Sequence, residues 1–107
     1  MMAVRLISDT ERNVFEFDGS RFYYRRISSN QAVIINKKHL KRGVVDQHAA
    51  GLETVQWCLI DWEHVLDGDG LEIPFSKDLV PALPDDLVNE LHMALRESSP
   101  VDDQLGN

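Results

Sequence analysis

Cys58, Asp61 and His64 are the residues whose types and spacing first suggest chemistry. A thiol, an imidazole and a carboxylate can act as nucleophile, general base and orienting group when hydrogen bonds link them. On a helix, steps of three residues would bring them to neighbouring positions. Many helices contain such trios without using them, and no glycine turn that could form an oxyanion hole adjoins this one. The pattern therefore favours a buried, structural Cys58 and predicts that the protein is not an enzyme.

A metal site is the second chemical possibility. Asp67, Asp69 and Glu72 lie around two glycines and could offer oxygen ligands to a hard cation. An EF-hand needs a carboxylate at the twelfth loop position, but alignment of Gly70 at the sixth position places Ser76 there. The histidines lack the H-x-x-x-H spacing that puts two ligands on one helical face; they are His39, His48, His64 and His92. We expect no metal and, because the glycine-rich nucleotide motifs are also missing, no other cofactor.

The elements that must position any site begin with a hairpin over residues 13–27, NVFEFDGSRFYYRRI. Asp18 and Gly19 tolerate the positive φ angles of a type I′ turn, and the flanking runs are rich in aromatic residues. A two-residue loop pairs Phe15 with Phe22 and Glu16 with Arg21, with the phenylalanines facing the core. Residues 4–7 could add a third strand.

Helices should follow the hairpin. Residues 31–42 are predicted to form the first, capped by Ser28, Ser29 or Asn30 and stopped by Gly43. Asp46 should cap a second helix that ends somewhere between Ile60 and Leu66, because apolar residues recur at helical steps. Its predicted stripe is His48, Leu52, Val55, Leu59, Trp62 and Leu66.

Gly51 within the second helix suggests a close helix contact. After a turn at residues 67–70 and an extended stretch at residues 71–75, Ser76 should cap a short helical turn. Pro84 begins a last helix, on which His92 is expected on the polar side. The predicted fold is therefore α+β, an N-terminal antiparallel hairpin or meander packed on about three helices. Residues 1–97 would form one domain, and residues 98–107 a disordered tail.

Charge is distributed unevenly along the chain. Residues 1–45 hold nine Lys/Arg and four Asp/Glu, which is +5, whereas residues 46–107 hold two and fourteen, which is −12. The halves could complement each other within one domain or steer partners and copies of the same chain, and we expect a homo-oligomer. Nucleic acid is a weaker expectation, because the net charge of −7 opposes phosphate attraction. The single cysteine and the lack of a long apolar run are typical of a cytoplasmic protein that does not contact membrane.

Aromatic and apolar residues in the middle of the chain are candidates for partner binding. Trp57 lies five residues before Trp62, on a different helical face, and large aromatic side chains carry much of the energy at interfaces. Ile73, Pro74 and Phe75 form an apolar triplet beside the turn, where loops commonly carry function. The structural alternative is that Ile73 and Phe75 only close the core over the second helix, and both possibilities stay open.

The linear pattern of residues 57–95, WCLIDWEHVLDGDGLEIPFSKDLVPALPDDLVNELHMAL, resembles phage tail assembly chaperones. The likeness is carried by W-x-x-V-x-D-x-D-G, then P-F-S and L-P-D-D-L, preceded by the hairpin, and it covers roughly residues 13–96. The resemblance implies a host-cell protein that binds the tail tape-measure protein, with tail-tube protein as a further partner, and prevents premature aggregation. The alternative is a small prophage DNA-associated regulator that uses the basic region from Arg25 to Arg42.

Overall fold

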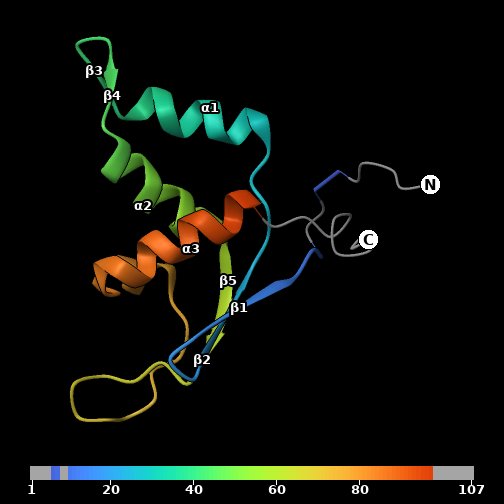
Figure 1. Cartoon of the computed structure of the whole chain (residues 1–107), viewed down its shortest axis with the longest axis vertical. Helices are drawn as coiled ribbons and strands as arrows, with labels where there is room; N and C mark the ends of the chain where they lie inside the picture. The colour runs from blue at the N-terminus through green and yellow to red at the C-terminus, as the bar shows by residue number, and fades with distance from the viewer. Residues whose placement is uncertain (1–5, 8–9, 98–107) are drawn as a thin grey trace.

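The computed structural model describes residues 6–7 and 10–97. It is an α+β structure in which a three-stranded antiparallel sheet packs with helices (Figure 1). Some of these helices precede the last strand of the sheet in the sequence and others follow it. The sheet order is β1 (Asn13–Phe17), β2 (Ser20–Tyr24) and β5 (Leu59–Glu63). The predicted α+β class is therefore confirmed, and the predicted disordered tail lies outside the described residues.

The predicted hairpin and its register are confirmed. β1 and β2 pair Phe15 with Phe22 and Glu16 with Arg21. Asp18 and Gly19 have φ angles of 50° and 83°, the positive values that a type I′ turn requires. Phe22 is fully buried, whereas Phe15 opposite it is only half-buried at the edge of the sheet.

The third strand is not the predicted one. Residues 4 and 5 lie outside the described part, and Leu6 and Ile7 belong to no strand. Instead, β5 pairs with β2, using residues that the sequence placed on the second helix. That helix, α2 (Gln47–Cys58), is capped by Asp46 as predicted, but it ends at Cys58 rather than between Ile60 and Leu66.

A bulge explains why the helical pattern was misleading. Tyr23 pairs with Asp61 but Tyr24 pairs with Leu59, so Ile60 is an extra residue on β5. Side chains alternate across a regular strand, and an extra residue restores the same side to residues three apart. Leu59 and Trp62 are consequently both buried. Their three-residue spacing imitates a helical stripe, while its outer members, His48 and Leu66, are exposed.

The first helix is also shorter than predicted. α1 (Ser29–Lys38) is capped by Ser28, whose Oγ accepts from the backbone N–H of Gln31 at 3.1 Å. It ends before Gly43, because residues 40–45 form a second hairpin, β3 (Leu40–Lys41) and β4 (Val44–Val45). Arg42 and Gly43 make its turn with φ angles of 53° and 78°. Gly43 therefore serves a hairpin turn rather than a helix end.

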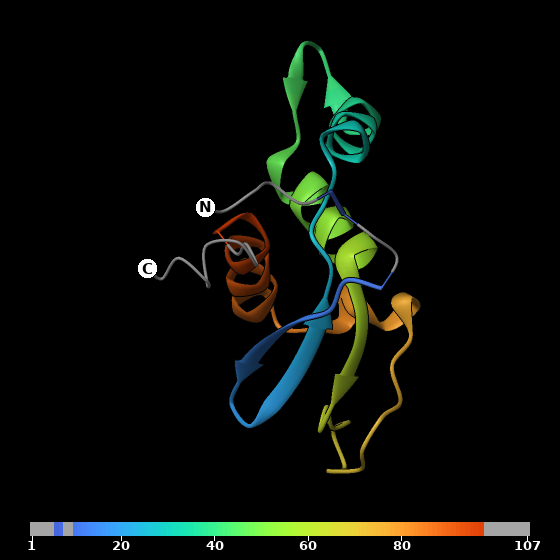
Figure 2. The same cartoon turned by 90° about the vertical axis from the view of Figure 1, so that its right-hand side faces the viewer.

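The rest of the chain covers the core. The turn at residues 67–70 and the extended segment after it are present, and Ser76 caps a 3₁₀ helix (Lys77–Ala82). α3 (Asp85–Glu97) follows Pro84 and lies beside α2 (Figure 2). Its apolar face meets residues of the sheet and of α2 in one core. The fully or nearly buried members are Phe22, Tyr24, Val55, Cys58, Leu59, Trp62, Val80, Leu87, Val88, Leu91 and Leu95.

Candidate partner-binding site

Trp57 lies in the last turn of α2 and is half-buried at the edge of the core. The guanidinium carbon of Arg25 stands 4.2 Å from the centre of a Trp57 ring, a cation–π arrangement that fixes one face of the indole. A shallow cavity of about 280 Å³ adjoins the ring and is lined by Arg25, Glu53, Gln56, Trp57 and Lys77. The site therefore offers an aromatic surface bordered by two cationic side chains and one carboxylate.

The Ile73–Phe75 segment is held against the core. The indole N–H of Trp62 donates to the carbonyl oxygen of Ile73 at 2.8 Å. The ring of Phe75 meets Trp62 edge to face, with centroids 5.1 Å apart. Pro74 between them is exposed. Phe75 therefore packs against the core, as the structural alternative predicts. Pro74 is the most exposed residue of the triplet.

Lys77 joins the two predicted segments. Its Nζ donates to the carbonyl oxygens of Gln56, Trp57 and Leu59 at 2.8, 3.0 and 3.0 Å. In return, the side-chain amide of Gln56 donates to the Lys77 carbonyl at 2.8 Å. Burial and the nearby charge of Arg25 lower the pKa of Lys77 below its ordinary value. The ammonium caps the C-terminal end of α2, where a cation complements the helix dipole.

Arg25 and Lys77 were not predicted to be parts of this site. Arg25 reaches Trp57 because its backbone N–H donates to the Cys58 carbonyl at 3.0 Å, which extends the pairing of β2 beyond its end. Lys77 reaches α2 because the chain returns from the turn at residues 67–70. Both contacts span many residues in sequence, so local patterns carry no signal for them.

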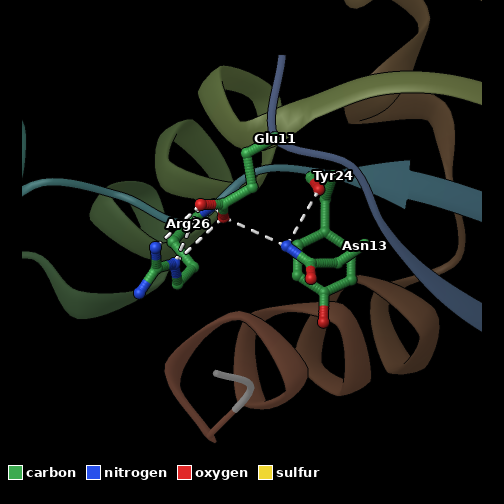
Figure 3. A network of polar contacts seen from close by, with 4 residues as sticks. All are labelled: Glu11, Asn13, Tyr24 and Arg26. Atoms are coloured by element: carbon green, nitrogen blue, oxygen red, sulfur yellow. Dashed lines mark hydrogen bonds and ion pairs between the residues drawn. The ribbon is translucent and has the colours of Figure 1, made fainter. Parts of the chain in front are cut away.

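A second unpredicted arrangement lies where the chain enters and leaves the hairpin (Figure 3). Glu11 precedes β1 and Arg26 follows β2, and their side chains meet at 2.8 Å. Glu11 also accepts from the backbone N–H of Arg26 at 2.8 Å and from the Asn13 amide at 3.1 Å. Burial alone would raise the pKa of Glu11, but the hydrogen bonds and charge of Arg26 outweigh it, so the pKa lies below its ordinary value.

Cationic side chains in the basic region from Arg25 to Arg42 contact other residues of the same molecule. Arg25 stacks on Trp57, Arg26 pairs with Glu11, and Lys38 pairs with Glu53 at 2.7 Å. Part of the positive charge from Arg25 to Arg42 is therefore already engaged within the molecule. That arrangement reduces the charge a nucleic-acid backbone would meet.

A groove lies between α1 and α3, with small residues of α2 as its floor. It measures about 320 Å³, and its lining includes Ala32, Asn36, Gly51, Thr54 and His92. Gly51 suggested a close helix contact from the sequence, and a Cβ atom there would lie 3.4 Å from the His92 ring of α3. His92 is half-buried against this glycine rather than on a polar face, and burial lowers its pKa.

The candidate catalytic trio is not assembled. Cys58 ends α2 and is fully buried, and burial raises the pKa of its thiol to about 12. Asp61 is on β5, and exposed His64 follows that strand with a φ angle of 59°. Such a thiol carries almost no thiolate at neutral pH, so it is a poor nucleophile.

Neither a metal centre nor a membrane span emerges from the described part of the chain. Within residues 6–7 and 10–97, no group of three or more His, Cys, Asp or Glu side chains could hold a metal ion. Among the helices of those residues, none combines the length and the hydropathy needed to cross a bilayer. Comparison of the chain with family models, with curated proteins and with solved structures finds no match.

Proposed function

We propose that this protein is a phage tail assembly chaperone, a non-catalytic binding protein that holds a segment of the tape-measure protein until the tail is built. The observation that carries the proposal is the linear pattern of residues 57–95, which resembles that family. Tail-tube protein is a second partner that the same resemblance implies.

The architecture of the patterned segment supports this proposal. Trp62 is buried and donates to Ile73, which draws the far side of the Asp/Gly turn back to the sheet. Phe75 packs on the same indole, and Ser76 then caps the next helical turn by accepting from the N–H of Asp78. The residues that make up the resemblance therefore cooperate in one structural unit, as expected of a pattern that specifies a fold.

Trp57 is the best candidate for the partner contact. Its ring is half-buried, and Arg25 holds it in place, so binding would cost little side-chain entropy. The Lys77 cap lies beside it and follows exposed Pro74 by three residues in the sequence. An aromatic anchor bordered by cations suits a segment that presents apolar and acidic side chains together.

Coexpression with the tape-measure protein encoded in the same genome tests this function. The wild-type chain should keep that protein soluble, and Trp57→Ala should reduce the soluble fraction, while Trp57→Phe should retain most of it because the aromatic ring is kept. Met93→Ala is the matched control, because Met93 is an exposed apolar residue on α3 and does not line the cavity at Trp57. Circular dichroism and thermal melting of each variant identify any loss that is due to unfolding.

Two results would reject the proposal. The tape-measure protein could remain equally soluble without this chain, in which case no chaperone is required. Alternatively, it could aggregate equally with and without the folded wild-type chain. If Trp57→Ala is folded and fully active, the chaperone assignment survives but the Trp57 surface does not.

A further inference from the structure

One end of the molecule is basic and carries exposed apolar side chains. We call residues 29–45, which form α1, β3 and β4, the basic end. They contain four Lys/Arg and no Asp/Glu. About half or more of each of four apolar residues is exposed there; these are Val33, Ile34, Leu40 and Val44. Lys38 is engaged with Glu53, so most of the charge of this end lies on Lys37, Lys41 and Arg42.

Another part of the molecule has the opposite charge and a similar apolar character. We call residues 63–72, which run from the end of β5 through the Asp/Gly turn, the acidic end. They contain four Asp/Glu and no Lys/Arg. Leu66 and Leu71, which lie on either side of the Asp/Gly turn in the sequence, are exposed by 55% and 66%, a large fraction for leucines.

The acidic end is preorganised. Asp67 Oδ1 accepts from the backbone N–H groups of Asp69 and Leu71 at 2.8 and 3.0 Å. The backbone N–H of Asp67 donates to the Leu71 carbonyl at 2.8 Å, and the N–H of Ile73 donates to the Val65 carbonyl at 2.8 Å. Because the turn is already formed, a partner would not have to order it on binding.

These two ends lie far apart in the same molecule. Figure 1 is drawn with the longest axis vertical; α1 and the β3–β4 hairpin are at the top, and the turn after β5 is at the bottom. The two ends of one copy therefore cannot cover each other. Their charges of +4 and −4 and their exposed apolar residues can meet only between different copies.

We propose that copies of this chain associate head to tail, with the basic end of one copy docked on the acidic end of the next. Such a contact is heterologous, so it leaves a free end at each side and continues into a chain or closes into a ring. Its apolar residues supply burial, and its charges supply orientation and salt dependence. The contact concerns this chain alone and does not depend on the proposed partner.

Charge exchange tests the orientation. The first variant, Lys41→Glu with Arg42→Asp, brings the formal charge of the basic end from +4 to 0; aspartate suits position 42, because its φ angle is 53°. The second variant, Asp69→Lys with Glu72→Lys, brings the formal charge of the acidic end from −4 to 0 and leaves the Asp67 turn bonds in place. Each variant alone should lose association, and an equimolar mixture should regain pairing, because the unchanged acidic end of the first variant can dock on the unchanged basic end of the second. Sedimentation velocity at about 50 mM and about 500 mM salt measures both effects, since the higher salt screens the charges.

A charge-matched control separates this contact from a general effect of net charge. Glu90→Lys with Glu97→Lys changes the net charge as much as the second variant does, but on exposed positions of α3, and should associate like wild type. Circular dichroism checks that all variants are folded. A wild-type protein that stays monomeric at low salt and high concentration would overturn the proposal. Folded single variants that associate normally, or a mixture that remains monomeric, would overturn it as well.

Discussion

At Gly51, the helices α2 and α3 lie close together. A Cβ atom added there would lie 3.4 Å from the His92 ring, within ordinary van der Waals contact. His92 on α3 is therefore close enough to touch a methyl group at position 51.

We predict opposite signs for two substitutions at this position. Gly51→Ala should raise the free energy of unfolding by about 0.5 to 1 kcal/mol, because alanine has the higher helix propensity and its methyl group fits. Gly51→Val should lower it by about 1 to 3 kcal/mol, because the larger side chain must displace the His92 ring. Urea denaturation of the two variants checks the pair. Equal effects of the two substitutions would contradict the close approach of α2 and α3.

Glu11 is the residue that joins the two ends of the β1–β2 hairpin. Its side chain is 10% exposed and that of Arg26 is 16% exposed, so this ion pair is largely shielded from water. The pKa of Glu11 is lower in the folded protein than its ordinary value of 4.5. The folded state therefore favours the charged form.

The pH dependence of stability follows from that direction. A carboxyl whose pKa is depressed on folding stabilises the protein above its unfolded pKa, and this contribution is lost as the pH falls through the folded pKa. We predict that Glu11→Gln lowers the melting temperature at pH 7 and makes its decline below about pH 4.5 shallower. Glu16→Gln, at an exposed ion pair with Arg21, should have little effect on either. Parallel acid profiles of wild type and Glu11→Gln would contradict this role.

Among the elements, the helix α2 is followed by the strand β5 without an intervening loop. The chain changes directly from helix to strand at Leu59. Lys77 donates hydrogen bonds to the carbonyl groups that this change leaves without helical partners. The cap therefore attaches the segment after the Asp/Gly turn to the end of α2.

We predict that Lys77→Met destabilises the protein by roughly 0.3 to 2 kcal/mol, because the methionine keeps the aliphatic stem but removes the cation from the helix end. The loss should be accompanied by faster hydrogen exchange in the last turn of α2. Lys41→Met, in the exposed β3–β4 hairpin, is the matched control and should change neither quantity. If exchange in the last turn of α2 is unchanged in Lys77→Met, the cap has no structural role.

At the scale of the whole molecule, elements set by neighbouring residues could be predicted and those set by distant ones could not. The Asp18–Gly19 turn and the Asp46 cap depend on a few adjacent residues, and both were predicted correctly. β5 was missed because its bulge places Leu59 and Trp62 on one side, as a helix would. The stacking of Arg25 on Trp57 depends on pairing between separate segments, which one sequence read locally does not reveal.

The candidate site was predictable to a similar extent. Trp62 was correctly expected in the core, and Trp57 was singled out from its position on another face of the helix. The role of Ile73–Phe75 remained open in the sequence, because an apolar triplet after a turn serves packing and binding equally well. The Trp62–Phe75 contact shows that Phe75 has a packing role.

Direct binding to the tape-measure protein tests the central claim. Purified wild-type chain should bind at least one of a set of overlapping fragments that cover the tape-measure protein of the same genome, measured by isothermal titration calorimetry. Trp57→Ala should weaken that binding by about tenfold or more, as expected for an aromatic anchor at an interface. The account is contradicted if the folded wild-type chain binds no fragment, and salt-sensitive binding to duplex DNA in the same series would favour the regulatory alternative instead.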